Sequence, residues 1–304
     1  MADLRNGCPT DANIKEAVCI DAGRVYDSCC DRDCLEDLRC FFLPETQALI
    51  NHAISVRLRS AEVLNVFVDV EPVHTETPVE LLAYTPDAAK CVARNALIAD
   101  NNYSTEQIEK IISNDDTTKK IVEAVVKCKR SRALECANYT LRFNNVSLSC
   151  ITHFARHRIQ SIQIPELIKT DRMSYIIPPV LNDKPELLEK YKNAFKETAE
   201  EYARLKTLGV PEELLVYYQL SGNTLDIVTT MNARQLLLFM RLRSCTRAQW
   251  EIQEYAVDAL KKLRNVEPAI FNFYGPSCFV GACPEGRMTC GRAAEIKEKF
   301  SNLK

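Results

Sequence analysis

The chain contains little glycine. It has 8 glycines in 304 residues, where an average usage of about 7% would give roughly 21. They stand at positions 7, 23, 209, 222, 275, 281, 286 and 291, so none lies between Arg24 and Leu208. Loops that cradle phosphate need glycine where the backbone approaches the phosphate closely. Because the chain has neither GxGxxG nor GxxxxGK[ST], side chains must hold any nucleotide that it binds.

An excess of one charge and long apolar runs are also missing. The 39 Lys and Arg residues nearly balance 41 Asp and Glu, and no basic stripe is interleaved with aromatics, which argues against nucleic-acid binding. The longest apolar runs, such as Leu236–Met240, fall far short of the ~20 residues that span a bilayer. The opening MADLRNG lacks the apolar core of a signal peptide. These features predict a cytoplasmic globular protein without a membrane or nucleic-acid partner.

Cysteine is abundant, with 14 residues. In a reduced compartment, clustered cysteines indicate metal binding, catalysis or burial more often than disulfides. Six fall within the first 40 residues, and the last four of these form a C-C-x3-C-x5-C pattern that matches no defensible metal template. Two prolines in EPVHTETP then predict a linker between Val70 and Val79. We therefore divide the chain into a small Cys-rich N-terminal segment, 1–72, and a second domain, 79–304.

The second domain has the patterns of an α+β protein. VELLAYT (79–85) and TLRFNNVSLS (140–149) are typical of strands, and a short helix is expected over 150–158. Helices are expected over 86–100, from a Ser104 capping box with Gln107, over 115–130, and from Pro185 to Leu208 before Gly209. Two further apolar helices are predicted from Thr224 to Arg243 and from Ala248 to Leu263.

The densest cationic cluster is Arg156-His157-Arg158, directly after the short helix. Successive helical residues point about 100° apart, so at least one of the three is expected to turn inward. One interpretation is a basic C-terminal helix cap. The other is an anion clamp, because guanidinium groups bind phosphate through two parallel hydrogen bonds.

Polar residues also interrupt the predicted helix Thr224–Arg243. Asn232, Arg234 and Arg243 lie in MNARQLLLFMRLRS. Eleven residues at 100° and 1.5 Å each place Asn232 and Arg243 on nearly one face, roughly 16 Å apart. That length suits a nucleotide lying along the helix. The alternative is that Arg241 and Arg243 are solvated and Asn232 pairs with backbone.

Together these motifs resemble a known family. RHRIQSIQ, followed by MNARQLLLFMRLRSCTRAQWEIQEYA, is similar to the flavin-dependent thymidylate synthases, whose signature reads R-H-R-x2-S-x-N-x2-S-x-R; the likeness covers Val79 to about Gly291. It implies a compact α/β domain with a long helical half and no Rossmann unit. It also implies a homotetramer with FAD between subunits, and reductive methylation of dUMP with methylenetetrahydrofolate as carbon donor and NADPH as reductant.

The resemblance implies roles for individual residues. The flavin-binding positions of the family fall on Arg156, His157, Arg158, Asn232 and Arg234. Arg243 matches the arginine that binds the pyrimidine nucleotide and polarises its ring, so it is the expected catalytic residue. Glu213 falls where the family carries a glutamate near the nucleotide.

The departures from the signature fall mostly on the substrate side. Gln163 replaces the Asn of the motif, and an ungapped register puts Glu166 and Ile168 at its Ser and Arg. A four-residue insertion would instead bring Thr170 and Arg172 there, and we favour this gapped register. Val216 stands where the family has a second nucleotide-binding arginine, His153 where it has a glutamine, and Leu238 where it has a flavin-contacting asparagine.

Two alternatives follow from these departures. The chain could methylate another pyrimidine nucleotide with the same flavin and folate chemistry. It could also be a non-catalytic, Cys-rich structural protein on a degenerate synthase scaffold. The N-terminal segment resembles the start of uncharacterised Cys-rich clostridial proteins, which leaves its role open.

The C-terminal tail, 276–291, carries a second cysteine cluster. Cys278, Cys283 and Cys290 form C-x4-C-x6-C among glycines, and Cys245 follows Arg243 by two residues. Four thiolates can close a tetrahedral zinc site or hold an iron–sulfur cluster. We therefore predict one structural metal on these four residues, with unligated reduced thiols as the alternative.

Overall fold

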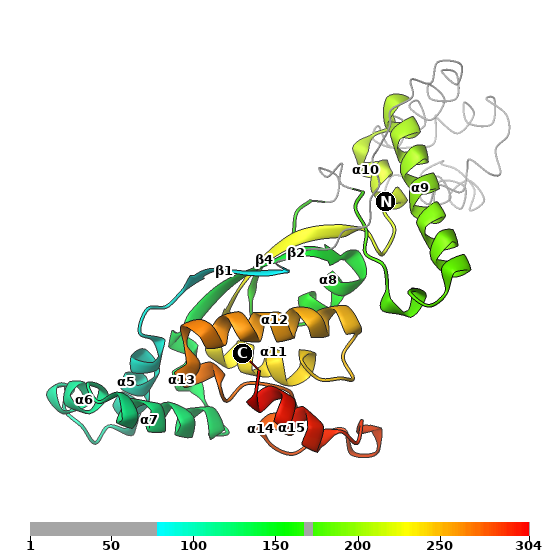
Figure 1. Ribbon diagram of the computed structural model, residues 1–304. Helices are drawn as coiled ribbons and strands as arrows, with labels where there is room; N and C mark the ends of the chain where they lie inside the picture. The colour runs from blue at the N-terminus through cyan, green and yellow to red at the C-terminus, as the bar shows by residue number, and fades with distance from the viewer. Residues whose placement is uncertain (1–77, 167–172, 304) are drawn as a thin grey trace, which may run out of the picture. The chain divides into compact units, whose positions relative to one another are not determined.

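A computed structural model describes residues 78–166 and 173–303 of the protein (Figure 1). These residues divide into two compact units, Tyr191–Gln219 and the remainder. The N-terminal segment predicted over 1–72 lies outside the described residues. Within the described part, no helix has both the length and the apolar character needed to cross a membrane.

The larger unit is built on a four-stranded sheet in the order β1-β2-β4-β3. The strands are β1 (Val79–Tyr84), β2 (Asn138–Ser147), β3 (Ser161–Gln163) and β4 (Thr224–Asn232). All three pairings are antiparallel. Because a Rossmann unit requires parallel strands joined by a crossover helix, the described strands contain none, as predicted.

The sheet has one apolar and one polar face. On β2, Tyr139 and Phe143 are fully buried beneath the helices. On the opposite face Arg142 forms a 3.0 Å salt bridge across the strands to Asp226 on β4. This alternation follows from the two-residue period of a strand, and it fixes the face on which the helices pack.

Helices make up most of the rest, which confirms the predicted α+β class. They are α5 (Ala88–Asp100), α6 (Thr105–Ile112), α7 (Asp115–Lys127), α8 (Leu148–Ala155), α9 (Pro185–Thr207), α10 (Glu212–Leu215), α11 (Ala233–Arg243), α12 (Trp250–Val266), α13 (Pro268–Phe271), α14 (Ser277–Val280) and α15 (Ala293–Ser301). The predicted capping box is present, since Ser104 Oγ accepts from Gln107 N and Gln107 Oε1 accepts from Ser104 N. Figure 1 shows α11 and α12 lying along one face of the sheet.

The prediction of one helix from Thr224 to Arg243 is wrong in its first half. Thr224–Asn232 is strand β4, paired with both β2 and β3. Its sequence, TLDIVTTMN, is rich in Thr, Val and Ile, and its buried and half-buried residues alternate from Leu225 onward. β-branched side chains favour this extended, alternating arrangement. Helix α11 begins only after Asn232.

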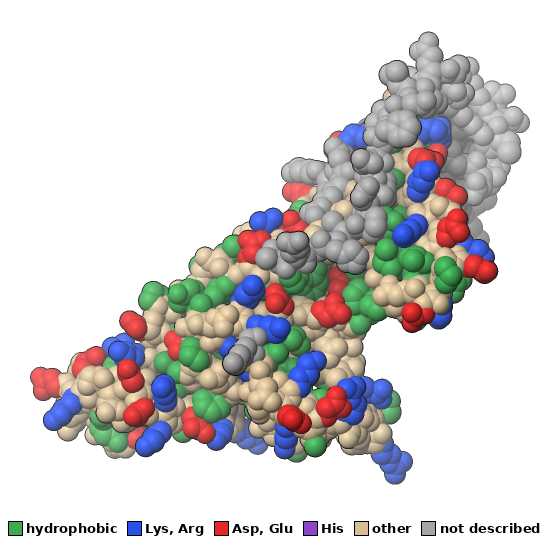
Figure 2. Space-filling model, in the orientation of Figure 1, with side chains coloured by type: hydrophobic (Ala, Val, Ile, Leu, Met, Phe, Trp, Pro, Cys, Tyr) green, Lys and Arg blue, Asp and Glu red, His purple; other side chains and the backbone are tan. Residues whose placement is uncertain are grey.

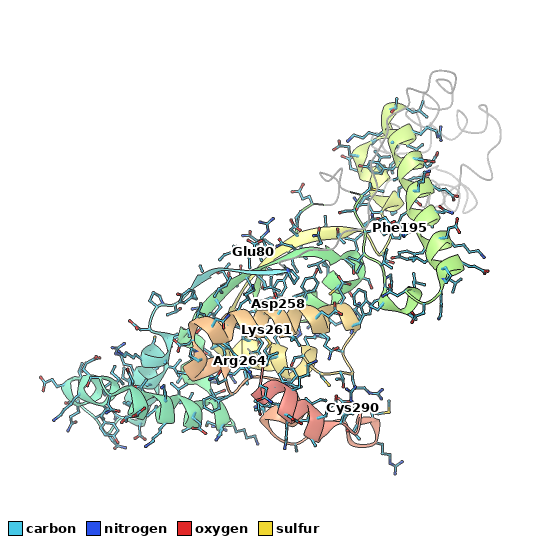
Figure 3. The ribbon with its side chains drawn as sticks, in the orientation of Figure 1. Glu80, Phe195, Asp258, Lys261, Arg264 and Cys290 are labelled. Atoms are coloured by element: carbon cyan, nitrogen blue, oxygen red, sulfur yellow. The ribbon has the colours of Figure 1, made fainter. Side chains whose placement is uncertain are left out.

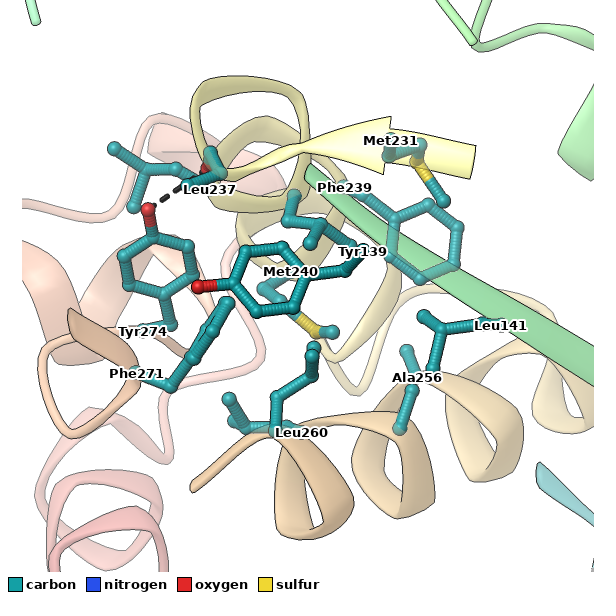
Figure 4. Packing of buried hydrophobic residues seen from close by; sticks show 14 of the residues in the cluster. Tyr139, Leu141, Met231, Leu237, Phe239, Met240, Ala256, Leu260, Phe271 and Tyr274 are labelled. Carbon is teal, nitrogen blue, oxygen red and sulfur yellow. Dashed lines mark hydrogen bonds between the residues drawn. The ribbon is translucent and has the colours of Figure 1, made fainter. Parts of the chain in front are cut away.

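Aromatic side chains fill the space between the sheet and the helices (Figure 4). The Tyr139 and Phe271 rings meet edge to face with centroids 4.8 Å apart. The Tyr274 hydroxyl donates a 2.8 Å hydrogen bond to the carbonyl of Ala233, where α11 begins. Edge-to-face ring pairs and a satisfied buried hydroxyl fix the start of α11 against β2.

A buried arginine ties α12 to the end of the chain. The Arg264 guanidinium donates to the carbonyls of Phe271 (3.2 Å), Tyr274 (3.1 Å), Phe300 (2.7 Å) and Leu303 (2.9 Å). Figure 3 shows Arg264 on α12 beside the C-terminal helix α15. Because one guanidinium binds carbonyls in α13 and α15 and in the residues that follow each of them, Arg264 anchors both helices to α12.

We expect Arg264→Met to lower the free energy of unfolding by about 3 kcal/mol, because four partly or fully buried carbonyls lose a charged donor. Denaturant unfolding followed by circular dichroism measures the change. Arg292→Met is the matched control, since Arg292 pairs with Glu295 at the surface and such pairs contribute about 1 kcal/mol or less. Equal destabilisation by the two variants would contradict the role of Arg264.

Candidate active site

Helix α8 delivers the cationic cluster to the surface. Its first turn is capped by Ser147, whose Oγ accepts from Cys150 N at 3.0 Å. The helix ends at Ala155, with Arg156 as its C-cap, so the prediction of a helix over 150–158 is wrong at its C-terminal end. Arg156 and Arg158 are exposed, and His157 is half-buried. The prediction that one member of the cluster turns inward is therefore confirmed for His157.

A buried glutamate holds the junction between β2 and α8. Glu251, on the first turn of α12, accepts hydrogen bonds from Ser147 N at 2.7 Å and from Ser147 Oγ at 2.6 Å. Burial raises the pKa of Glu251. Sequence reasoning missed this residue, because WEIQEYA also contains Gln253 and Glu254 and its pattern does not show which acid is buried.

The structure brings His157 and Arg243 together, although 86 residues separate them. Arg243 Nε donates to His157 Nε2 at 2.8 Å, and Arg243 Nη2 donates to the His153 carbonyl at 3.3 Å. The His157 ring also packs on Phe239, with centroids 5.0 Å apart. Since a guanidinium only donates, His157 Nε2 must be an acceptor, and the ring is neutral with its proton on Nδ1.

Electrostatics support the neutral ring. Burial and the adjacent Arg243 charge lower the pKa of His157 to about 4. Burial is the main cause that lowers the pKa of Arg243, and the nearby positive charge of Arg156 lowers it further. Arg156 and Arg243 therefore add their positive potential in one region at the end of α8.

We expect the His157 ring to stay neutral to well below pH 6. Because the folded-state pKa lies below the unfolded value of about 6.5, this group contributes stability that is complete above pH 6.5 and is lost as the pH falls through about 4. An NMR titration of the ring measures the pKa directly. In Arg243→Met the pKa should rise, and a wild-type ring that titrates near pH 6.5 would contradict the predicted pairing.

The other end of α11 carries the remaining flavin-binding candidates. Asn232 is the N-cap of the helix, where its Oδ1 accepts from Gln235 N at 2.9 Å. The Arg234 guanidinium pairs with Glu135 at the surface. Eleven helical residues separate this end from Arg243 by roughly 16 Å, so the candidates form two groups at opposite ends of α11.

The structure does not show where three predicted substrate-binding residues lie relative to Arg243 and His157. Thr170 and Arg172 lie outside the described residues. Glu213 lies on α10 in the unit Tyr191–Gln219, and its side chain is exposed. Their predicted roles stay predictions.

The C-terminal cysteines gather around one cavity. Its volume is about 230 Å³, and its lining includes Cys245, Cys278, Cys283 and Cys290. Burial and the three neighbouring thiols raise the pKa of Cys278. All four are free thiols, and no group of three or more His, Cys, Asp or Glu side chains in the described part of the chain is arranged to hold a metal ion. The described residues therefore do not show the predicted metal site.

Known proteins are similar to the part of the chain that carries these residues. A family model described as thymidylate synthase complementing protein matches residues 80–269. A flavin-dependent thymidylate synthase from Geobacter sulfurreducens is 32% identical over 229 residues, which cover 74% of this chain and 98% of the relative. The enzyme of that name from Clostridium tetani is 33% identical over 240 residues, which cover 73% and 96%.

Solved structures share the fold. A UMP/dUMP methylase, PolB, from Streptomyces cacaoi bound with 5-Br dUMP has a TM-score of 0.57 at 16% identity, covering 67% of this chain and 95% of that chain. ThyX from Helicobacter pylori complexed with FAD and dUMP has a TM-score of 0.51 at 20% identity, covering 64% and 97%. At these identities the likeness shows the fold alone.

Proposed function

Because the chain belongs to the flavin-dependent thymidylate synthase family, we propose that it methylates dUMP to dTMP with FAD as cofactor. Methylenetetrahydrofolate is the proposed carbon donor and NADPH the proposed reductant. The observation that carries the proposal is the Arg243–His157 pair, which unites the two most specific motifs of the resemblance in one cationic site. Neither motif alone would exclude a basic helix cap.

The residues fit the charge of FAD. Arg156 and Arg158 are exposed, and within the described ranges neither forms a salt bridge. Two exposed arginines, two positions apart in the chain and without a salt bridge, suit a pyrophosphate, which glycine-poor loops in this chain could not cradle. His157, Asn232 and Arg234 complete the proposed flavin-binding set. FAD, when bound, supplies the hydride chemistry of the reaction.

The outer side of α11 offers apolar surface for a flat ring. Leu238 and Leu242 are 47% and 45% exposed, and they lie four residues apart on one face of the helix. Leu238 replaces the flavin-contacting asparagine of the family, so stacking would replace a hydrogen bond at this position. We propose that this stripe lies along the bound cofactor.

Arg243 is the proposed catalytic residue. Its two hydrogen bonds in the described residues use Nε and one Nη2 proton, which leaves three N–H groups for a ligand. When hydride adds to a pyrimidine ring, negative charge develops on its carbonyl oxygen, and a fixed guanidinium stabilises that charge. His157 is a positioning residue, since it acts by holding Arg243. Thr170, Arg172 and Glu213 are the proposed nucleotide-binding partners.

The same site could accept another pyrimidine nucleotide. The observation that favours this second candidate is Val216, which stands where the family has a nucleotide-binding arginine. Turnover of dUMP, UMP and dCMP by the purified protein separates the candidates. Turnover of dUMP alone would eliminate the second one, and turnover of UMP or dCMP at a comparable rate would favour it.

Complementation tests the proposed reaction in the cell. A thymidine-requiring host that expresses the chain should grow without thymidine, and the purified protein should be yellow with a flavin spectrum. A well-expressed protein that takes up no added FAD and supports no growth would overturn the proposal in favour of a structural role.

We further propose that the enzyme is cytoplasmic and that it forms a homotetramer. Light scattering on the purified protein tests the homotetramer. Basic and acidic side chains are interspersed on the face of the described residues that Figure 2 shows.

A further inference from the structure

Two hydrogen bonds fasten the tail to the end of α11, beside a cavity that four cysteines line. Ser277 Oγ donates to the Arg241 carbonyl at 3.3 Å, and Arg247 Nε donates to the Met288 carbonyl at 3.1 Å. Arg241, Arg247 and Ser277 line a cavity of about 230 Å³ together with four cysteines, Cys245, Cys278, Cys283 and Cys290. Residues that join the two segments therefore belong to the same cavity wall as the four cysteines.

We propose that this cavity is the binding site of a metal centre with four thiolate ligands, which clamps the C-terminal tail to the segment that follows Arg243. The proposal is independent of the reaction assigned to the protein. It concerns a thiophilic metal, as either one zinc ion or an iron–sulfur cluster, because four cysteines are the ligand set that these centres share.

Spacing along the chain supports four convergent ligands. The thiols come from three places: Cys245 follows α11, Cys278 lies on α14, and Cys283 and Cys290 lie in the loop before α15. Figure 3 shows Cys290 in that loop. Eight of the chain's 304 residues are glycine, and three of them, at 281, 286 and 291, lie in this short stretch. Gly291, with φ +73°, directly follows Cys290, and such a backbone is strained for other residues.

Charge balance supports a dianionic centre. Four thiolates around one divalent zinc leave two negative charges, and burying them requires nearby cations. Arg241, Arg243 and Arg247 are among the residues that line the same cavity. Arg241 Nε is also buried without a hydrogen-bond partner among the described residues.

In the structure the four thiols are not arranged to hold a metal ion. A zinc–sulfur bond is about 2.3 Å, so single-ion binding would draw the sulfur atoms to within about 4 Å of one another. A Cβ built at Gly281, Gly286 or Gly291 would meet no atom within 4 Å, so closure of the loop that carries Cys283 and Cys290 would not have to displace packed side chains at these glycines. A cluster would need less closure, because it fills more of the cavity.

Metal analysis of the full-length protein, purified without oxygen, tests the proposal. Zinc, iron and acid-labile sulfide are measured per chain in the wild type, in Cys283→Ser/Cys290→Ser and in Cys128→Ser, an exposed thiol outside the cavity. We expect the double variant to lose about one zinc, or about four iron with their sulfide, that Cys128→Ser retains. Equal metal content in all three proteins, or none in the wild type, would overturn the proposal.

Protection of the thiols gives a test that needs no variant. The wild type is treated with iodoacetamide before and after a chelator removes metal, and labelling of each cysteine is followed by mass spectrometry. Bound metal should slow alkylation of Cys283 and Cys290 at least tenfold, while Cys128 labels at one rate throughout. Unchanged labelling of Cys283 and Cys290 would overturn the proposal even if the Ser variants fail to fold.

Discussion

Arg243→Met is expected to lower kcat/KM for dUMP about 10²–10³-fold, with most of the loss in kcat. The guanidinium is preorganised by His157 Nε2 at 2.8 Å and by the His153 carbonyl at 3.3 Å, so its free N–H groups need no reorganisation when charge develops on the pyrimidine. Methionine keeps the volume of the side chain and removes the charge. Steady-state kinetics with dUMP, together with the flavin spectrum, measure the effect.

Two further variants show whether geometry or charge matters at this position. Arg243→Lys keeps the cation but has one nitrogen in place of the planar guanidinium, whose Nε and Nη2 make the two hydrogen bonds, so it should recover only part of kcat. Arg94→Met is the matched control, because Arg94 pairs with Glu109 at the surface of helix α5. A kcat/KM for Arg243→Met within threefold of the wild type would remove Arg243 from the mechanism.

The sequence predicts the cationic cluster but not its architecture. The rule that three consecutive helical residues cannot share a face predicts an inward side chain. In the structure His157 does turn inward, but α8 ends at Ala155, so the helical rule is not the reason. Which side chain turns inward depends on Phe239 and Arg243, more than 80 residues away. Local spacing contains no information about that contact. The resemblance names both partners, whereas only the fold shows that they touch.

The error over Thr224–Asn232 has a specific physical cause. Apolar residues run through both this segment and α11, and a short apolar run does not distinguish a buried strand from a buried helix. What decides is pairing with β2 and β3 on either side, which no local pattern encodes. The N-cap at Asn232 was the available signal, because Asn with a hydrogen bond to Gln235 N marks a helix start.

Arg156→Met/Arg158→Met is expected to raise the dissociation constant for FAD about 10²–10⁴-fold, so that the purified protein is colourless. Each charge-assisted hydrogen bond contributes about 1.5–3 kcal/mol, and two are removed. Both side chains are exposed at the end of α8, so the fold should be unaffected. Fluorescence titration with FAD gives the dissociation constant, and circular dichroism shows whether the variant is folded.

Lys129→Met/Arg130→Met removes two exposed neighbouring cations beyond α7, and it separates a local effect from the loss of net charge. This control should bind FAD within about threefold of the wild type, because isolated surface charges are screened over about 10 Å at 0.1 M salt. If both double variants weaken FAD binding equally, the flavin is attracted by the overall charge, and the cluster after α8 is only a basic helix cap. If only Arg156→Met/Arg158→Met loses FAD binding, these two arginines bind the phosphates of FAD. They would then do so in a chain that has no glycine-rich loop for this purpose.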